Sequence, residues 1–431
     1  MPKTIATSFP VERFTLDNGL RVVVSPDASS PTVDVTIAYD VGMRSEPEGR
    51  TGFAHLFEHF MFQGSESLPK GEFDKHIESN GGVNNGFTRH DQTVYYEVLP
   101  SNALEIALFL EADRLRALDL TEESLRNQID VVKEEIQVNV RNTAYGGFPW
   151  LFLPAVMFTT FPNAHDGYGS FEDLEAATID DAVDFFSKYY TPGNAILAVA
   201  GDTTTEEVAA LVERHFGDIE ARPTPPRGDF SEPQPSSERR SVHTDPNAPR
   251  PALALGYRVP DPIDQLTEYA AVVVLASVLG DGDASRLYQR LVKTDRIATH
   301  VQAYAGEFGD AFGSRDPTML EIVAYYVDAG AKRSLIQAID EEIARIAGGI
   351  DAAEVERVTS AMTAEYLWGV DQIIGRTTDL VTLEQIRGRA EFINEIPSVL
   401  RAVTPEQVAE AAGRWLDPSG RAVLEWEPPA A

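Results

Sequence analysis

The chain of 431 residues contains no cysteine. It can therefore form no disulfide, and it has no thiolate to bind a metal or to attack a substrate. Basic residues are scarce as well: 36 Lys and Arg stand against 68 Asp and Glu, which gives a formal net charge of −32. This charge disfavours nucleic acid and anionic membranes as partners. It would steer basic peptides toward the surface, although solubility alone explains it equally well.

The chain also lacks long apolar segments. Its first residues, Met1-Pro2-Lys3-Thr4-Ile5-Ala6, have no apolar core of the kind found in secretory signals, and no apolar run is long enough to span a bilayer. The sequence therefore predicts a soluble cytoplasmic protein. A G-x-S-x-G sequence, which marks the nucleophile of many serine hydrolases, is absent too, so serine catalysis has little support.

The most informative sequence that is present is His55-Leu56-Phe57-Glu58-His59. On a helix, positions i, i+3 and i+4 share one face, so both histidines and Glu58 would point the same way. Two neutral imidazoles one turn apart can bind one Zn²⁺, and a carboxylate beside them can serve as general base for the attacking water. This is the H-E-x-x-H arrangement of metalloproteases in inverted order. A chance match and buried structural histidines on an apolar helix are the alternatives.

Glu135 is the predicted third ligand of this metal. The segment from Thr121 to Asn142 has the pattern of an amphipathic helix, with Thr121 as its N-cap and an acidic first turn. Residues spaced by three and four form one largely apolar face: Gln128, Val131, Val132, Glu135, Val138 and Asn139. A carboxylate on such a face is costly unless it is paired or binds a cation, whereas Glu134 lies on a solvent-like stripe. Two histidines and Glu135, with a fourth position open, form the ligand set of a catalytic zinc site with one Zn²⁺ per chain.

The chain is predicted to consist of two similar halves. Five prolines among polar residues from Ala221 to Arg240 indicate an extended linker. The segment Thr178–Ala200 aligns without a gap with Thr404–Trp426, and both contain a helix that begins at Thr, a turn with Pro and an apolar strand. An internal duplication of about 226 residues explains the match, and coincidence between two common units is the alternative. We predict an N-terminal zinc-binding domain at 1–220, a linker at 221–245 and a C-terminal homologous domain without a metal site at 246–431.

Strands and helices are expected in an order that does not alternate regularly. The first half contains predicted strands near 13–25, 33–40, 82–88, 92–99 and 195–201, and predicted helices at 53–62, 73–79, 103–118, 122–140, 179–189 and 205–216. In the second half, 352–389 is a long helical stretch interrupted near Gly369 and Gly375. The fold class is therefore α+β: two homologous domains, each a mainly antiparallel sheet covered by helices.

A glycine-rich strand, from Gly81 to Thr88, is a candidate for peptide binding. Glycine allows another backbone to approach closely, and an exposed strand edge can bind a peptide as an additional strand. An ordinary hairpin rich in turn residues explains the same sequence equally well.

These motifs together resemble the pitrilysin/insulinase family of inverted-zincin metallopeptidases. The resemblance is densest from Asn18 to Asp202, and its most specific part is the H-x-x-E-H sequence with Glu135 at 76 residues beyond His59. The chain length is similar to that of the short-chain branch, which includes the mitochondrial processing peptidase subunits and bacterial heterodimeric homologues. The resemblance implies two homologous α+β domains per chain and two chains that close around a peptide-binding chamber.

The resemblance also implies roles for individual residues: zinc ligands at His55, His59 and Glu135, a general base at Glu58, and pairing with the substrate backbone at Asn85, Gly86 and Phe87. Family members usually carry a second Glu seven residues before the ligand Glu, where this chain has Gln128. An amide can still hydrogen-bond a metal ligand, so we expect Gln128 to alter metal affinity or rate without removing the site.

A second departure from the family pattern concerns substrate binding. Active single-gene relatives have an Arg and, seven residues later, a Tyr that hold the substrate carbonyl, and here Val292 and Thr299 stand at those places. The sequence therefore predicts the catalytic subunit of a heterodimeric zinc endopeptidase that hydrolyses peptides or unfolded segments, with a homologous partner that supplies the Arg and Tyr. The alternatives are a self-sufficient homodimer in which Arg286, Arg290 or Tyr304 substitutes, and a non-catalytic scaffold subunit of the same family.

Overall fold

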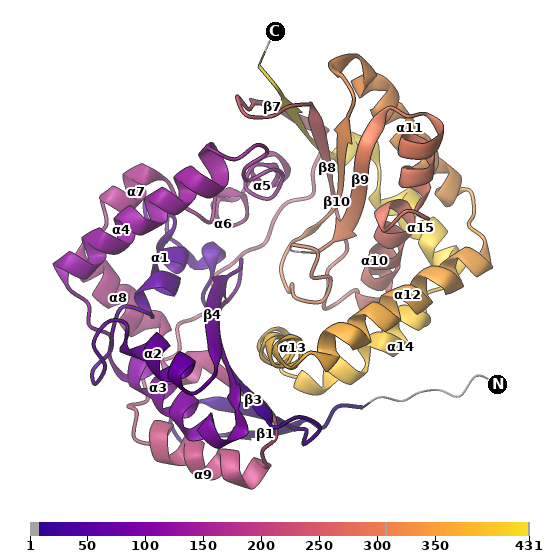
Figure 1. Cartoon of the computed structure of the whole chain (residues 1–431). Coiled ribbons are helices and arrows are strands. Elements are labelled where there is room, and N and C mark those ends of the chain that lie inside the picture. The colour runs from indigo at the N-terminus through magenta and orange to yellow at the C-terminus, as the bar shows by residue number, and fades with distance from the viewer. Residues whose placement is uncertain (1–7, 307, 430–431) are drawn as a thin grey trace. The chain divides into compact units, whose positions relative to one another are not determined.

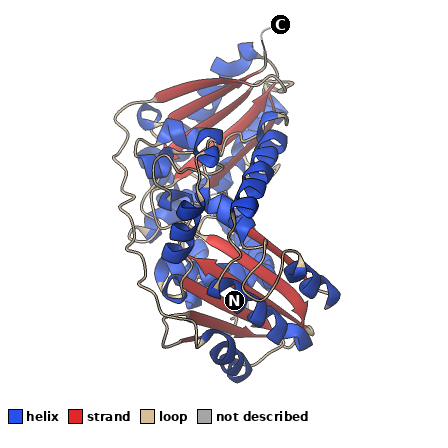
Figure 2. Ribbon diagram, turned by 90° about the vertical axis from the view of Figure 1, so that its left-hand side faces the viewer, coloured by secondary structure: helices blue, strands red, loops and turns tan. Residues whose placement is uncertain are grey.

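The computed structural model describes residues 8–306 and 308–429. By their internal contacts, these residues form two compact units, each built from segments that are not contiguous in the sequence. Unit 1 comprises the described residues up to Val132 together with Gly167–Gly228 and Tyr366–Ile396. Unit 2 comprises Lys133–Asp166, Asp229–Glu365 and the described residues from Pro397 onward. Each unit contains one sheet with helices packed on it (Figure 1, Figure 2).

The sheet of unit 1 has six strands. Their spatial order is β1 (Glu12–Thr15), β2 (Arg21–Pro26), β6 (Ala195–Gly201), β3 (Thr32–Tyr39), β5 (Thr93–Pro100) and β4 (Val83–Thr88). Neighbouring strands are antiparallel except for β2 and β6, which are parallel. Strands β3 and β6 are buried along almost their whole length, as expected for central strands covered on both faces. Strand β4, the predicted peptide-binding strand, lies at one end of the strand order.

Helices from distant parts of the sequence cover this sheet. Both α3 (Leu104–Arg116) and α13 (Ile373–Arg387) pack on β3, although α13 belongs to the last fifth of the chain. The hydroxyls of Thr36 on β3 and Thr377 on α13 lie 2.8 Å apart, which ties this helix to the sheet. The other helices of unit 1 are α1 (Phe53–Phe60), α2 (Glu72–Ser79), α7 (Phe171–Glu175), α8 (Ile179–Tyr189) and α9 (Thr205–Phe216).

The sheet of unit 2 has five strands. Their order is β7 (Arg239–Thr244), β11 (Ala422–Glu427), β8 (Ala252–Arg258), β10 (Met319–Tyr326) and β9 (Ala298–Ala305). Only the pair β7 and β11 is parallel. The helices of this unit are α5 (Leu153–Met157), α6 (Phe161–Ala164), α10 (Leu266–Gly280), α11 (Lys332–Ala347) and α15 (Pro405–Trp415). Three further helices pass from one unit into the other: α4 (Glu122–Ile136), α12 (Ala352–Asp371) and α14 (Ile396–Arg401).

The two sheets share one topology. The order β2-β6-β3-β5-β4 in unit 1 corresponds to β7-β11-β8-β10-β9 in unit 2, and both orders begin with the parallel pair. The aligned helices α8 and α15 each begin at a capping box, on Thr178 and Thr404, and each leads through a short 3-10 turn into the strand that follows. The prediction of two homologous α+β domains is confirmed. The boundaries at 1–220, 221–245 and 246–431 stay a prediction, because compact units and duplicated domains divide a chain by different criteria.

Most predicted helices and strands are present, and the differences have local causes. The single strand expected near 13–25 is two strands, β1 and β2, joined by a turn in which Gly19 has φ of 94°. The three short helices α5, α6 and α7 were not predicted, because four or five residues are too few for a helical period to be recognised. The expected interruption of the long helical stretch is present at Gln372, between α12 and α13. Within the described residues, no helix is long and apolar enough to cross a bilayer.

Candidate active site

Helix α1, which contains the H-x-x-E-H sequence, is fixed at its N-terminus by a buried carboxylate. Glu46 accepts hydrogen bonds from the backbone N–H groups of Gly52 at 2.9 Å and Ala54 at 2.7 Å. An anion at this position satisfies N–H groups that have no partner within the helix and interacts favourably with the helix dipole. Gly52 has φ of 85°, and a Cβ there would lie 2.5 Å from the carbonyl oxygen of Tyr168. A glycine is therefore required where α1 begins.

The apolar face of α1 packs against α8. The rings of Phe53 and Phe57 lie 5.9 and 4.7 Å from the ring of Phe185, and Leu56 and Phe60 are buried as well. These four side chains form the apolar face of the helix. Its burial turns the opposite side of the helix, with both histidines and the glutamate of the motif, away from the α8 contact.

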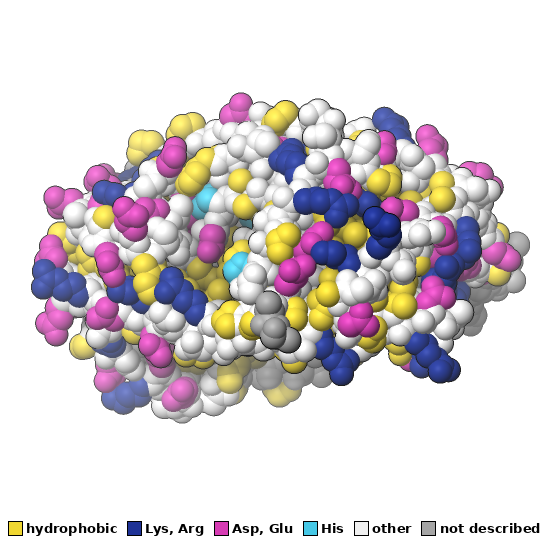
Figure 3. All heavy atoms as spheres, turned by 90° about the horizontal axis from the view of Figure 1, so that it is seen from above, with side chains coloured by type: hydrophobic (Ala, Val, Ile, Leu, Met, Phe, Trp, Pro, Cys, Tyr) yellow, Lys and Arg dark blue, Asp and Glu magenta, His cyan; other side chains and the backbone are white. Residues whose placement is uncertain are grey.

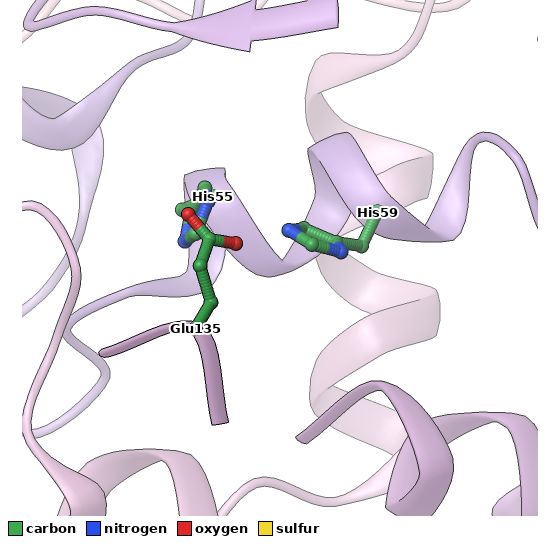
Figure 4. A group of neighbouring side chains, drawn as sticks. All are labelled: His55, His59 and Glu135. Carbon is green, nitrogen blue, oxygen red and sulfur yellow. The ribbon is translucent and has the colours of Figure 1, made fainter. Parts of the chain in front are cut away.

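The three predicted metal ligands lie together. The ligand atoms of His55, His59 and Glu135 are all within 4.8 Å of one another, and Figure 4 shows their polar ends pointing toward one another. Glu135 follows Val132, the last residue of this segment of unit 1, on the same helix α4. The helix is continuous, and its first part belongs to unit 1 together with α1. Over the described ranges, this is the one group of three His, Cys, Asp or Glu side chains that could hold a metal ion.

The donor set fits zinc. Bonds of about 2.0–2.2 Å to nitrogen and oxygen place neighbouring ligand atoms of a tetrahedral ion about 3.4 Å apart. Atoms that already lie within 4.8 Å of one another reach this geometry by small side-chain rotations. His55 is buried, whereas His59 and Glu135 are half-buried, so the group remains accessible from one side. Three protein ligands that include imidazoles and a carboxylate are typical of catalytic zinc sites, which keep one position for water or substrate.

Helix α4 buries a face somewhat different from the predicted one. Thr121 does cap the helix, because its hydroxyl accepts a hydrogen bond from the backbone N–H of Ser124 at 3.1 Å. The buried side chains are Leu125, Gln128, Ile129, Val132 and Ile136. Val131 and Val138 are 42% and 50% exposed, so their assignment to the buried face was wrong.

Two causes explain this difference. Leu125, Ile129 and Ile136 form a larger apolar stripe than the valines do, and residues 137–141 are π-helical, which shifts the angular position of Val138. Glu135 lies at the margin of the buried face and is half-buried, whereas Glu134 is exposed as expected.

Two contacts of the motif were not predicted: one comes from Thr88, the last residue of the predicted peptide-binding strand, and the other from Tyr168. The hydroxyl of Thr88 donates a hydrogen bond to Oε2 of Glu58 at 2.8 Å. The ring of Tyr168 meets the ring of His55 edge to face, with the centroids 4.9 Å apart, and the rings of His55 and His59 are also 4.9 Å apart. Neither Thr88 nor Tyr168 has a local sequence signal, since each meets the motif only through the tertiary fold.

The other predicted site residues lie on α4 and β4. Gln128 is buried, and its amide donates to the side-chain oxygen of Asn127 at 3.2 Å. Asn85 is exposed on β4, and its side chain accepts a hydrogen bond from the backbone N–H of Gly86 at 2.9 Å. A Cβ on Gly86 would lie 2.9 Å from the ring of Tyr95, so this position requires glycine. The predicted roles of these residues and of Phe87 stay predictions.

The second half of the chain was expected to lack the substrate-binding Arg and Tyr. Val292 is half-buried in the π-helical segment Tyr288–Thr294, and Thr299 is exposed on β9. The three residues considered as substitutes bind carboxylates of the same unit: Arg286 binds Glu354 at 2.5 Å, Arg290 binds Asp295 at 2.5 Å, and Tyr304 binds Glu321 at 2.9 Å. These pairs hold all three side chains within unit 2.

Family models match both halves of the chain. Residues 21–146 match the model described as Insulinase (Peptidase family M16), and residues 176–362 match the model described as Peptidase M16 inactive domain. The chain belongs to the M16 peptidase family. The resemblance to the pitrilysin/insulinase family is thereby confirmed.

Named relatives of this M16 chain include zinc proteases and processing peptidase subunits. Zinc protease PqqE of Helicobacter pylori is 28% identical over 395 residues, which cover 88% of this chain and 85% of that protein. A probable mitochondrial-processing peptidase subunit beta of Arabidopsis thaliana is 26% identical over 416 residues, which cover 93% and 75% of the two chains. The crystal structure of a protease from Helicobacter pylori has the same fold, with a TM-score of 0.89 at 24% identity over 98% of this chain and all of that one.

Proposed function

We propose that this M16 chain is a zinc-dependent endopeptidase that hydrolyses peptides or unfolded segments. The observation that carries the proposal is the convergence of His55, His59 and Glu135 beside Glu58, which lies on the same face of α1 as the two histidines. The names of the relatives, a zinc protease and a subunit of a processing peptidase, support the same reaction class.

Glu58 is the proposed general base. Zinc, when bound by the three ligands, supplies a Lewis acid that polarises the scissile carbonyl and makes water more acidic. The carboxylate of Glu58 takes a proton from the water as the water oxygen bonds to the carbonyl carbon. Glu58 then gives this proton to the amide nitrogen as the C–N bond breaks, so the products are a carboxylic acid group and an amine.

Strand β4 is the proposed binding site for the peptide backbone. It lies at the end of the strand order, and an extended peptide can pair with such an edge as an additional strand. Its last residue, Thr88, contacts Glu58, so a peptide that extends β4 is guided toward the base. Asn85, Gly86 and Phe87 lie on the strand one to three residues before this contact.

A non-catalytic scaffold subunit is the second candidate function. It is favoured by the match of residues 176–362 to the model called an inactive domain. That match covers most of unit 2. In this unit, α10 is the helix that follows β8, just as α1 follows β3 in unit 1. Helix α10 contains no histidine. The first half brings the three candidate ligands together, which a scaffold subunit does not need, and we therefore prefer the catalytic function.

The proposed enzyme is one subunit of a heterodimer. Val292 and Thr299 stand where active single-gene relatives have the Arg and Tyr, and the three candidate substitutes are held by carboxylates. A homologous chain with the Arg and Tyr would complete the site. We also propose a cytoplasmic location.

The Glu58→Gln variant tests the reaction class. It should bind zinc as the wild-type chain does but cleave a mixed peptide library roughly 10²–10⁴-fold more slowly, because the amide cannot accept the proton. The measurement is mass spectrometry of the products together with metal analysis, with the homologous partner present where cleavage requires it. Glu134→Gln, a change of the same kind at an exposed position, is the matched control and should leave cleavage unchanged. Wild-type turnover by Glu58→Gln would show that the assignment is wrong.

A further inference from the structure

One face of β4 is directed toward the helices of unit 1. Side chains alternate along a strand, so Asn84, Gly86 and Thr88 share this face. The amide of Asn84 donates to a carboxylate oxygen of Asp74 on α2 at 2.9 Å. At the end of the strand, the hydroxyl of Thr88 donates to the carboxylate of Glu58 on α1 at 2.8 Å. The strand is therefore bound to both helices by side-chain hydrogen bonds, one of which reaches the proposed general base.

The middle of this face lies against an aromatic ring. Gly86 pairs with Tyr95 of β5, and the missing side chain of Gly86 leaves room for the ring of Tyr95. The hydroxyl of Tyr95 lies 3.4 Å from the backbone carbonyl oxygen of Phe57, one residue before Glu58. The position of α1 relative to β4 is thus supported by packing as well as by hydrogen bonds.

The contact between Thr88 and Glu58 is suited to hold a carboxylate in one orientation. A hydroxyl has one proton, and Oε2 of Glu58 at 2.8 Å is a closer acceptor than the carbonyl oxygen of Ala54 at 3.5 Å. A hydrogen bond to a charged acceptor is stronger than one between neutral groups. Threonine is β-branched and has few side-chain rotamers, whereas a glutamate side chain has several and loses more entropy when it is held in place.

We propose that Thr88 is a positioning residue for Glu58. Its hydroxyl holds Oε2 and thereby fixes the orientation of the carboxylate that takes the proton of the attacking water. Because Thr88 is the last residue of β4, the base is aligned with the same strand that pairs with the peptide backbone. The inference rests on the proposed function of Glu58 and adds to it the group that orients the base.

The test compares two substitutions at this position in the active assembly. Thr88→Val keeps the shape of the side chain but removes the hydroxyl, and it should lower kcat by about ten- to a hundredfold with little change in KM and with one zinc per chain retained. Thr88→Ser keeps the hydroxyl and should restore most of the activity. Thr32→Val removes a hydroxyl from another strand of the same sheet and should leave kcat unchanged. In a crystal structure of Thr88→Val, the carboxylate of Glu58 should have moved from its wild-type position.

Three outcomes would overturn this role. These are wild-type kcat for Thr88→Val, equal losses for Thr88→Val and Thr88→Ser, and an unmoved Glu58 carboxylate in the Thr88→Val crystal structure. In a Glu58→Gln background, Thr88→Val should cause little further loss, because both changes act on the same group. If Thr88→Val lowered kcat by the same factor in the Glu58→Gln background as in the wild-type chain, Thr88 would act through a group other than Glu58. Failure of the proposed function is recognised separately: Glu58→Gln would then cleave as well as the wild-type chain does.

Discussion

Glu134 and Glu135 are adjacent carboxylates with different surroundings. Glu134 is exposed on α4, whereas Glu135 is half-buried and its carboxylate lies beside the two histidines. We predict that His55→Ala, His59→Ala and Glu135→Ala each remove most of the bound zinc, because two remaining ligands hold the ion weakly. Glu134→Ala is the matched control and should keep one zinc per chain.

Metal analysis of the purified variants decides between the two glutamates. The overall fold should survive in all four variants, since each unit has its own apolar core. If Glu134→Ala loses zinc while Glu135→Ala retains it, the assignment of the third ligand is wrong.

At the scale of residues, the sequence predicted three candidate ligands that do lie together, but not the side chains that contact them. The spacing of His55, Glu58 and His59 places them on one helix face whatever the rest of the fold, and Glu135 follows from the helical period of its own segment. Thr88 meets Glu58 across 30 residues of sequence, and the chain between them forms a second helix before it returns as β4. No local pattern encodes such a contact, because it depends on how strands and helices pack.

A buried carboxyl group on β3 makes stability depend on pH. Burial raises the pKa of Asp34 to about 7, against the opposing effect of the hydroxyls of Thr36 and Thr377. Between the ordinary pKa of an aspartate and pH 7, the folded chain keeps a proton that the unfolded chain has lost. Stability from this group is therefore present at low pH and decreases as the pH rises, by at most about 1.4 kcal/mol per unit, until it levels off above pH 7.

The Asp34→Asn variant removes this titration. We predict that its free energy of unfolding, measured by urea denaturation of the metal-free protein, falls less between pH 5 and pH 7 than that of the wild-type protein. Above pH 8 the two curves should run parallel. A constant difference across the whole pH range would contradict the raised pKa.

At the scale of the helix, the carboxylate of Glu46 determines where α1 begins. It accepts hydrogen bonds from the N–H groups of Gly52 and Ala54 in a buried environment. Glu46→Ala leaves these donors without that acceptor, which should cost roughly 1–3 kcal/mol of stability. We expect a lower thermal unfolding midpoint and weaker zinc binding, because the two histidines that we propose as zinc ligands lie on the same helix.

The control for this prediction is Glu48→Ala, which removes an exposed carboxylate two residues away and should change neither quantity. Added zinc should raise the midpoint of the Glu46→Ala variant, since a ligand that binds only the folded state stabilises it. An unchanged midpoint for Glu46→Ala would show that another group can satisfy the helix N-terminus.

Secondary structure was predictable where the pattern of apolar and polar residues repeats over several helical turns or along a whole strand. Helix α8 and helix α15 were located by their Thr caps and their amphipathic patterns, and the break between α12 and α13 was expected from its glycines. The position of α13 on the sheet of unit 1 was not predictable, because its sequence does not say which half of the chain it covers. The buried face of α4 was predicted only in part, because the prediction placed two exposed valines on it and left out larger apolar side chains that are buried.

At the scale of the whole molecule, the excess of acidic residues affects how this chain associates with a second protein chain. The formal net charge of −32 is carried by acidic side chains that, on the face seen in Figure 3, are interspersed with basic ones. Two identical copies repel each other most strongly at low ionic strength, because salt screens charges beyond about 10 Å at 0.1 M. A homologous partner of lower negative charge would be repelled less, which agrees with the proposed heterodimer.

The division of the catalytic groups leads to the prediction about this partner. Hydrolysis requires the metal and base together with groups that hold the substrate carbonyl against them, since alignment lowers the activation barrier by several kcal/mol. In the proposed function this chain provides the first set near Glu58, and Val292 and Thr299 stand at the places that the family resemblance assigns to the second. We predict that the chain purified alone binds zinc but cleaves peptides poorly, and that a homologous chain with the Arg and Tyr restores cleavage.

Light scattering and a peptide cleavage assay on the separate and mixed chains test this prediction. The mixture should show the mass of a one-to-one complex, and its activity should be lost when the partner's Arg and Tyr are replaced by Val and Thr. The same mixture made with Glu58→Gln should be inactive, which shows that the base comes from this chain. Robust cleavage by a pure homodimer would instead mean that Arg286, Arg290 or Tyr304 leaves its carboxylate partner to bind the substrate, and that no second chain is needed.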